Sequence, residues 1–196
     1  EVDMLYRLAA AGVHVPQPYS FFEGVLLMEL ISNDCGDIAP RLNDLQMTAK
    51  QARSYHRILI RQVVRMLCAG VVHGDLSQFN ILAGGQGPVI IDLPQAIEAA
   101  GNSNARQMIK RDVDNLTTYL SRFAPELAHT DYGSEIWALY QSGKLHKTIN
   151  LTGQIQRNNK PVNVNNVLEV IGTVLKKEAA RQRYKQERWT SPYSQC

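Results

Sequence analysis

Three polar side chains, Asp75, Asn80 and Asp92, stand where together they could bind and transfer phosphate. Asp75 and Asn80 belong to the segment HGDLSQFNIL, and Asp92 ends the apolar run PVIID. Phosphoryl transfer requires in-line positioning, a metal that neutralises the phosphates and a carboxylate at the attacking hydroxyl. Two of these three requirements could be met here, with Asp75 as the carboxylate and with Asn80 and Asp92 as ligands of the metal.

Asn80 and Asp92 are predicted to face each other across a β-hairpin. The segments ILA and VII are apolar β-formers, and they enclose the glycine-rich turn GGQG. If the hairpin is symmetric about Gln86, Ile81 opposes Ile91 and Asn80 opposes Asp92. Directly opposed β-carbons lie about 4.5–5.5 Å apart. At that separation an amide oxygen and a carboxylate could share one Mg²⁺ ion, which keeps its other positions for waters and phosphate oxygens.

Two other interpretations of this segment stay open. His73 could act as the base, because its usual pKa suits proton transfer near neutral pH, although a histidine that enters such a loop more often packs and binds backbone. An aspartate followed five residues later by an asparagine is also common in ordinary turns, since both side chains cap turns. The combination with the glycine turn and the Ile-Ile-Asp sequence at hairpin distance favours a phosphate site.

The surrounding pattern predicts mostly helices, with a few strands near these polar residues. Gly12 and Gly70 stand where the first two helices would end. A turn at Glu23-Gly24 leads into an apolar run at 25–31, which predicts a buried strand. The predicted helices cover residues 1–11, 48–69, 109–122, 134–141 and 164–188.

The composition is that of a globular protein. The chain has 196 residues, of which 44% are hydrophobic and 20% charged, and its net charge of +3 does not by itself indicate nucleic-acid binding. Cys35, Cys68 and Cys196 form no Cys-x-x-Cys pair, which argues against a disulfide framework or a zinc site and fits a reducing compartment. No apolar run approaches the roughly 20 residues that span a bilayer. Because no leader sequence follows Glu1, we expect a cytoplasmic protein. Because the first residue is Glu1 and not methionine, we also expect a piece of a longer chain.

These segments together resemble the catalytic core of the protein-kinase-like superfamily and, within it, the bacterial-type RIO family of atypical serine protein kinases. The resemblance covers about the first 125 residues and implies an α+β, protein-kinase-like fold, mainly the helical C-lobe with the end of the N-lobe. Aminoglycoside and choline kinases share the His-Gly-Asp-x4-Asn pattern, but there an aromatic residue usually follows the metal-binding aspartate, whereas Leu93 follows Asp92 here. The segments that carry the resemblance are VPQPY at 15–19, LLMELI at 26–31, HGDLSQFNIL at 73–82, IIDLPQAIE at 90–98 and RDVDNL at 111–116.

The resemblance implies ATP and Mg²⁺ as cofactors, and it assigns roles to single residues. Asp75 matches the catalytic-loop aspartate, while Asn80 and Asp92 match the two metal ligands. In RIO proteins the metal aspartate can also accept phosphate, so Asp92 is expected to form an acyl-phosphate intermediate. Asp112 resembles the aspartate that braces the catalytic loop, against the alternative of a helix N-cap or a solvated charge.

Four further residues resemble parts of the nucleotide site. Met28 matches the gatekeeper, and Glu29 and Ile31 lie on the hinge, where backbone groups would pair with the adenine edge. Glu1 matches the helix glutamate that pairs with the ATP-binding lysine. The alternative for Met28 and Ile31 is that they are only core residues.

The sequence departs from the kinase pattern in three ways. No glycine-rich phosphate loop and no strand lysine precede Glu1, so we expect an N-terminally truncated chain that could be inactive on its own. Gly74 stands where conventional kinases have an arginine that senses a phosphorylated activation loop. Only 18 residues separate Asp92 from Arg111, without an Ala-Pro-Glu sequence. RIO proteins share the last two departures, which put phosphorylation of an ordinary peptide substrate in doubt.

We predict three regions: the end of the N-lobe at 1–31, a C-lobe at 32–146, and a polar loop with a basic helix at 147–196. The six basic and two acidic side chains of 176–188 could contact ribosomal RNA, which would suit the ribosome-assembly role typical of the family, or form a solvated face. The expected function is that of an ATP- and Mg-dependent RIO-type serine/threonine protein kinase or ATPase. The alternatives are a small-molecule phosphotransferase on the same scaffold and a non-catalytic, kinase-like binding module.

Overall fold

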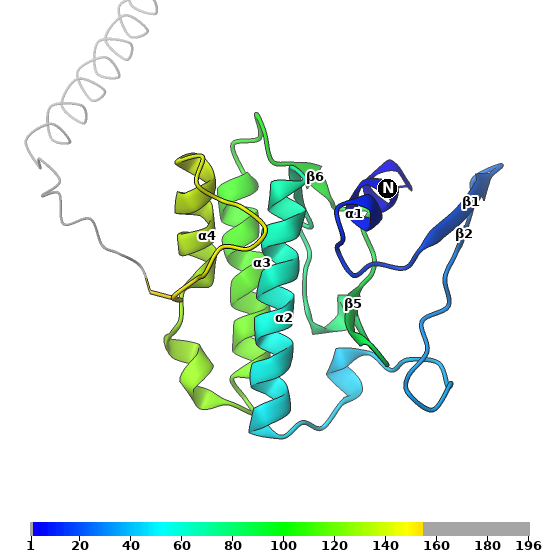
Figure 1. The fold of residues 1–196 in the computed structure, drawn as a ribbon, viewed down its shortest axis with the longest axis horizontal. Coiled ribbons are helices and arrows are strands. Elements are labelled where there is room, and N and C mark those ends of the chain that lie inside the picture. Colours follow the sequence, from blue (N-terminus) through cyan, green and yellow to red (C-terminus); the bar gives the residue numbers. More distant parts are fainter. Residues whose placement is uncertain (1, 155–196) are drawn as a thin grey trace, which may run out of the picture. The chain divides into compact units, whose positions relative to one another are not determined.

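The computed structural model of the protein describes residues 2–154, which form helices and three small two-stranded sheets (Figure 1). The predicted helix at 164–188 lies outside the described residues. The α-helices are α1 (Val2–Ala10), α2 (Ala49–Cys68), α3 (Ala105–Leu120) and α4 (Tyr132–Gln141), and the 3-10 helices are η1 (Leu42–Asp44), η2 (Gln78–Asn80) and η3 (Pro125–His129). The strands are β1 (Pro18–Phe22), β2 (Val25–Met28), β3 (Val71–Val72), β4 (Ile81–Gly84), β5 (Gly87–Ile90) and β6 (Ile97–Glu98).

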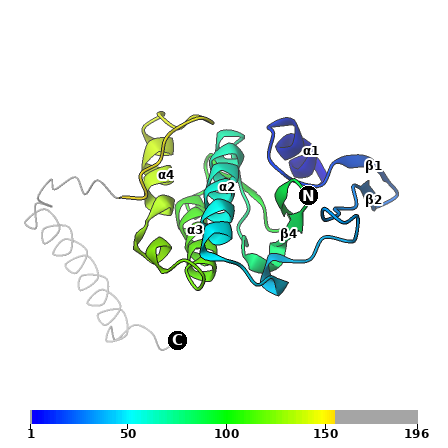
Figure 2. The same ribbon diagram turned by 60° about the horizontal axis from the view of Figure 1, so that its bottom comes forward.

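Helices α2, α3 and α4 lie side by side, and the β4–β5 hairpin lies between α2 and the β1–β2 hairpin (Figures 1 and 2). The helix predicted at 48–69 is confirmed, and its ends follow from its sequence. Thr48 and Gln51 form a capping box at its start, which satisfies backbone N–H groups that have no partner in the first turn. Gly70 follows the last turn with a φ of +76°, a conformation that glycine adopts without strain.

The third helix begins earlier than predicted. Its buried bulky side chains start at Ile109, but the helix itself begins at Ala105, which is completely buried. The prediction missed this first turn because its contact with the core is made by a small alanine among polar neighbours. Between α2 and α3, His56 Nε2 lies 2.9 Å from Thr117 Oγ1, and burial lowers the pKa of His56 to about 4.

Helix α1 is tied to the helical layer at its C-terminal end. Its inward side chains Leu5 and Leu8 belong to the main hydrophobic core. Arg65 of α2 donates to Gly12 O at 2.9 Å, and Lys147 donates to Ala11 O at 3.0 Å. Cations at these carbonyls suit the negative end of the helix dipole, so both contacts help to fix α1.

The β1–β2 hairpin is where predicted, but the strand after its turn is shorter and more exposed than expected. We predicted a buried strand over 25–31, whereas β2 ends at Met28 and three of its four side chains are exposed. In the part of the chain that the structure describes, β2 pairs only with β1, and no second layer covers it. The prediction of a buried strand at 25–31 is therefore wrong, because an apolar run alone does not indicate burial.

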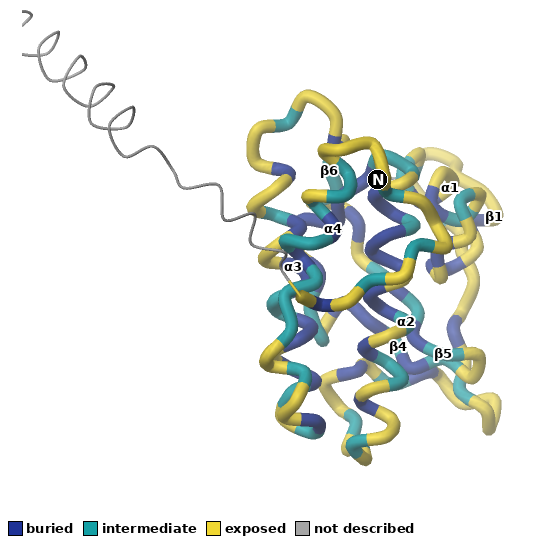
Figure 3. The backbone as a smooth tube through the Cα atoms, turned by 60° about the vertical axis from the view of Figure 1, so that its left-hand side comes forward, coloured by how far each residue is buried: buried dark blue, intermediate teal, exposed yellow. Residues whose placement is uncertain are grey.

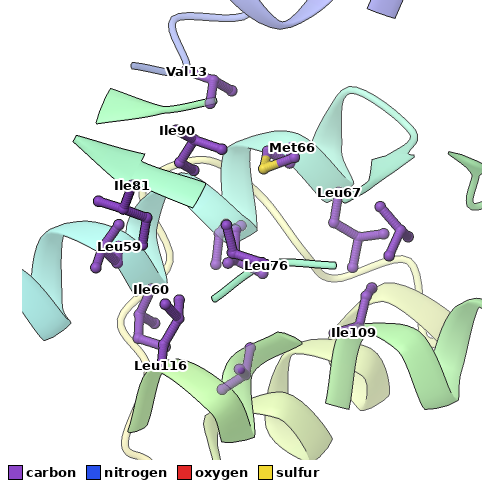
Figure 4. Packing of buried hydrophobic residues seen from close by; sticks show 14 of the residues in the cluster. Val13, Leu59, Ile60, Met66, Leu67, Leu76, Ile81, Ile90, Ile109 and Leu116 are labelled. Carbon is purple, nitrogen blue, oxygen red and sulfur yellow. The ribbon is translucent and has the colours of Figure 1, made fainter. Parts of the chain in front are cut away.

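The core lies where α2, α3 and the β4–β5 hairpin meet (Figures 3 and 4). Leu76 belongs to this core, although it lies in the loop between β3 and η2 (Figure 4). Its side chain is 0% exposed, and burying a leucine side chain fully stabilises a fold by roughly 1.5–3 kcal/mol. The loop that carries Asp75 and Asn80 is therefore anchored from inside. None of the helices in residues 2–154 is long and apolar enough to cross a membrane.

Candidate functional site

The segment from His73 to Asn80, called the catalytic loop after its predicted role, connects β3 to β4 and ends in η2. The carboxylate of Asp112 holds the backbone of this loop, as the family resemblance predicted. Asp112 Oδ2 accepts a hydrogen bond from Gly74 N at 2.8 Å, and Oδ1 accepts one from Leu76 N at 3.1 Å. The alternative of a solvated charge is wrong, since Asp112 is only 2% exposed. Burial raises the pKa of Asp112 to about 6, against the opposing effect of the two backbone N–H donors.

Two neighbours of Asp112 on α3 also bind the catalytic loop, a role that was not predicted for them from the sequence. Arg111 donates to Gly74 O, and Asn115 donates to Leu76 O at 3.3 Å. The signal was available in the spacing, because Asn115 lies four residues after Arg111 on the same side of a helix. Together with Asp112 they satisfy both the N–H and C=O groups of Gly74 and Leu76.

Gly74 is required by the backbone as well as by its neighbours. Its φ is +83°, and a β-carbon there would lie 2.5 Å from Met108 Cε and 2.7 Å from Gln95 O. A side chain at this position would collide with α3 and with the segment after β5. The glycine that replaces the arginine of conventional kinases is therefore explained by packing at this loop.

His73 is a structural residue of the catalytic loop. It is 2% exposed; its Nε2 lies 3.1 Å from Ile91 O, and its Nδ1 accepts a hydrogen bond from Asp75 N at 3.3 Å. Because the carbonyl can only accept, Nε2 carries the proton and Nδ1 is the acceptor. Burial lowers the pKa of His73, and the hydrogen bond to the Ile91 carbonyl and the nearby carboxylates of Asp75 and Asp92 oppose that shift. Both ring nitrogens are engaged, so the ring is not available as a base.

Asp75 is exposed and lies next to Asn80. Asn80 Nδ2 donates to the Asp75 carbonyl oxygen at 2.9 Å and approaches Asp75 Oδ2 at 3.4 Å. The amide nitrogen of Asn80 thus faces Asp75, and within residues 2–154 its oxygen, Oδ1, has no hydrogen-bond partner. That oxygen can bind a cation while Asp75 stays open to solvent.

The register of the β4–β5 hairpin differs from the prediction by one residue. Ile81 pairs with Ile90 and Gly84 with Gly87, so the turn has two residues and not three. Ile91 N donates to Asn80 O at 3.0 Å, which places Asn80 opposite Ile91 and not opposite Asp92.

Asp92 nevertheless opens onto the same space as Asn80. It follows the last ladder hydrogen bond with a φ of +68°, a left-handed conformation that aspartate tolerates better than most residues. Non-glycine residues held in this conformation cluster at functional sites. Both Asp92 and Asn80 line a cleft of about 690 Å³ between the catalytic-loop side and the β1–β2 side of the structure.

The other wall of this cleft contains the predicted hinge. Met28, Glu29 and Ile31 all line it; Met28 and Glu29 are exposed, and Ile31 is buried. Glu29 N donates to Gln17 O at 2.9 Å, which fixes the segment against the strand before it. Among the described residues, Glu29 O and Ile31 N have no hydrogen-bond partner. The predicted role of Glu1 lies outside the described residues.

The donors around the cleft suit a magnesium nucleotide better than a free metal ion. No group of three or more histidine, cysteine, aspartate or glutamate side chains within residues 2–154 could hold a metal. Asn80 and Asp92 supply two oxygen donors, and Mg²⁺ commonly takes one or two carboxylates and completes its octahedron with waters and substrate phosphates. The residues present therefore fit Mg²⁺ that arrives with a polyphosphate.

Comparison with known proteins agrees with this geometry. The family described as the RIO domain matches residues 1–132. This chain is a RIO-domain protein. RIO domains are protein-kinase-like, and the mixed helices and small sheets confirm the predicted α+β fold.

The RIO-domain chain is similar to proteins named as kinases. It is 36% identical over 123 residues to the RIO-type serine/threonine-protein kinase Rio1 of Haloferax volcanii, covering 62% of this chain and 41% of the relative. It is 34% identical over 124 residues to the human serine/threonine-protein kinase RIO1, covering 62% and 21%. The match to Rio1 of Thermoplasma acidophilum is 29% identical over 126 residues and covers 64% of each chain. The chain thus spans less than two thirds of each of these relatives.

Proposed function

We propose that the protein is an ATP- and Mg-dependent phosphotransferase, a serine/threonine protein kinase or ATPase of the RIO type. The observation that carries this proposal is the convergence of Asn80, Asp92 and the hinge segment on one cleft, with Asp75 hydrogen-bonded to Asn80 at the loop beside it. The similarity to named RIO kinases supports the same conclusion. Neither a small-molecule phosphotransferase nor a non-catalytic module is favoured by these relatives.

The hinge would bind the adenine ring through its backbone. Glu29 O can accept from the exocyclic amine, and Ile31 N can donate to the neighbouring ring nitrogen, because both groups lack a partner among the described residues. Met28, Ile31 and Leu82 line the cleft and offer apolar surface to the ring. Adenine would therefore be recognised by two directed hydrogen bonds within a largely apolar slot.

Asn80 Oδ1 and the Asp92 carboxylate would hold Mg²⁺ against the phosphates. When bound, the ion neutralises charge on the phosphate oxygens. Asn80 is kept in place by its hydrogen bond to the Asp75 carbonyl at 2.9 Å, and Asp92 by its left-handed backbone at the end of the hairpin. Each ligand is thus fixed by a different element of the fold.

Asp75 would accept and orient the proton of the attacking hydroxyl. Its carboxylate is exposed, so an acceptor can reach it, while its backbone is held by His73 and Asn80. In the ATPase form of the proposal, a carboxylate oxygen of Asp92 attacks the terminal phosphorus and ADP leaves. Water would then release phosphate from the acyl-phosphate.

Other parts of the proposal depend on the sequence alone. We assign Glu1 to the partner of an ATP-binding lysine, and the basic segment 176–188 to contact with ribosomal RNA. We also propose that the protein is cytoplasmic. Its three regions would be those predicted above: an N-lobe end at 1–31, a C-lobe at 32–146 and an appended region at 147–196.

A substrate screen with radiolabelled ATP tests the proposal. The full-length product of the gene is incubated with γ-labelled ATP and Mg²⁺, together with either protein acceptors or a panel of hydroxylated metabolites that includes aminoglycosides and choline. We expect label on protein serine or on the enzyme itself, or released as inorganic phosphate, and none of this in EDTA. Label that appears only on a metabolite would support the small-molecule alternative, and the absence of any transfer or hydrolysis would support the binding module.

A further inference from the structure

A second hollow is here called the arginine groove. It shares no lining residue with the cleft that Asn80 and Asp92 line, which is called the nucleotide cleft from here on. It is bounded by α2, by η3, by the start of α4 and by residues 149–151, and its volume is about 240 Å³. The segment that contains 149–151 crosses from α4 back to α2 (Figure 1). The proposed phosphotransfer chemistry uses none of the groove's residues.

Three arginines of α2 form one rim of the groove. Arg53, Arg57 and Arg61 are all exposed, and their spacing of four residues places them in one row, about 6 Å apart along the helix. Arg53 pairs with Glu126 at 3.2 Å, whereas no carboxylate lies within ion-pair distance of Arg57 or Arg61 in residues 2–154. No aspartate or glutamate lines the groove. Arg57 and Arg61 therefore give this rim of the groove positive charge that no neighbouring carboxylate compensates.

The floor of the groove is apolar. Ile60, Leu127, Ile149 and Leu151 line it, and all four contribute to the hydrophobic core or pack against it. His56 lies beside them, buried against Tyr132 with ring centroids 5.5 Å apart and bonded to Thr117. Because burial keeps this histidine neutral at pH 7, the positive charge comes from the arginines alone.

From this arrangement we infer that the arginine groove binds an acidic peptide segment of a partner protein, with one apolar side chain inserted between the arginines and the floor. Charge complementarity favours glutamate or aspartate on both sides of that side chain, because guanidinium groups bind carboxylates with paired hydrogen bonds. The groove is smaller than the roughly 300–1,000 Å³ of most small-molecule sites. Single-stranded RNA is less suitable, since it binds to platforms of several aromatic side chains, whereas Tyr132 is the only tyrosine, tryptophan or phenylalanine that lines the groove.

The test measures fluorescence anisotropy of short labelled peptides with the full-length protein. The first probe has a single leucine flanked by glutamates; one matched probe replaces the leucine by serine, and another replaces the glutamates by lysine. We expect saturable binding of the first probe only, with or without Mg-ATP. A labelled oligouridylate serves as the RNA probe, and binding of that RNA in place of the acidic peptide would overturn the proposal.

Charge reversal in the groove gives the matched comparison. The double variant Arg57→Glu with Arg61→Glu should weaken binding of the acidic peptide by at least about tenfold, because two attractive contacts become repulsive. Arg106→Glu with Arg122→Glu removes the same charge from exposed positions of α3 and beyond, and it should leave binding nearly unchanged. Thermal melting of both proteins verifies folding. Equal weakening of peptide binding in both double variants would mean that net charge alone explains the effect, and it would contradict binding at the arginine groove.

Discussion

Replacing Asp75 with asparagine is expected to slow phosphoryl transfer by the full-length protein at least about a hundredfold, the lower end of effects seen when a general base is removed. That factor corresponds to about 2.7 kcal/mol of transition-state stabilisation. Asparagine has nearly the same shape as aspartate, and the main contact of Asn80 is to the backbone carbonyl of residue 75. The variant should therefore still bind Mg-ATP, so the loss should appear in kcat.

Transfer is measured as initial rates with radiolabelled ATP over a range of ATP concentrations. Glu126→Gln provides a control, because it removes an exposed carboxylate that lies outside the nucleotide cleft and forms an ion pair with Arg53. Near-normal turnover by Asp75→Asn would remove Asp75 from its assigned role. A rise in KM at constant kcat would make it a residue of substrate binding only.

Asp92→Ala is expected to abolish Mg-dependent nucleotide binding, because it removes the one carboxylate assigned to the metal. A ligand at a hundred times its Kd stabilises a protein by about 2.7 kcal/mol. The wild-type protein should show this gain in free energy of unfolding with Mg-ATP, and the variant should show almost none. The measurement is a thermal or denaturant melt with Mg-ATP and with ATP plus EDTA.

The left-handed backbone at Asp92 calls for a second variant. Alanine tolerates a φ of +68° less well than aspartate, so Asp92→Ala could lose stability without the nucleotide. Asp92→Asn retains a residue that tolerates this conformation while it removes the charge. Loss of the Mg-ATP response in both variants supports the metal role; a full response in Asp92→Asn would show that the carboxylate charge is not needed.

Local signals in the sequence were enough to predict the helices that position the site. In α2, apolar side chains recur at helical spacing and Gly70 ends the helix. These features act within one or two turns of the chain. The brace from Asp112 to the catalytic loop could be predicted only through the family resemblance, since it joins residues 36 and 38 positions apart.

Features that depend on distant packing were predicted less well. The hairpin register was off by one because GGQG allows a turn of two or three residues, and local sequence does not distinguish them. In the structure Gly85 lies close to Asp34, a contact with a distant segment. The exposure of β2 could not be predicted from its apolar composition, because burial depends on whether another layer covers the strand. Arg111 and Asn115 were missed because polar residues on a helix are usually solvated, and their carbonyl partners lie in a loop.

Anomalous diffraction from crystals of the full-length protein with Mn²⁺ and a non-hydrolysable ATP analogue tests the central claim most directly. We predict one manganese peak shared by Asn80 Oδ1 and the Asp92 carboxylate at about 2.0–2.2 Å, close to the distance expected for Mg²⁺. The Asp75 carboxylate should face the terminal phosphate from the same side. A manganese ion bound without Asn80 or Asp92, or an Asp75 side chain turned away from the phosphate, would contradict the account.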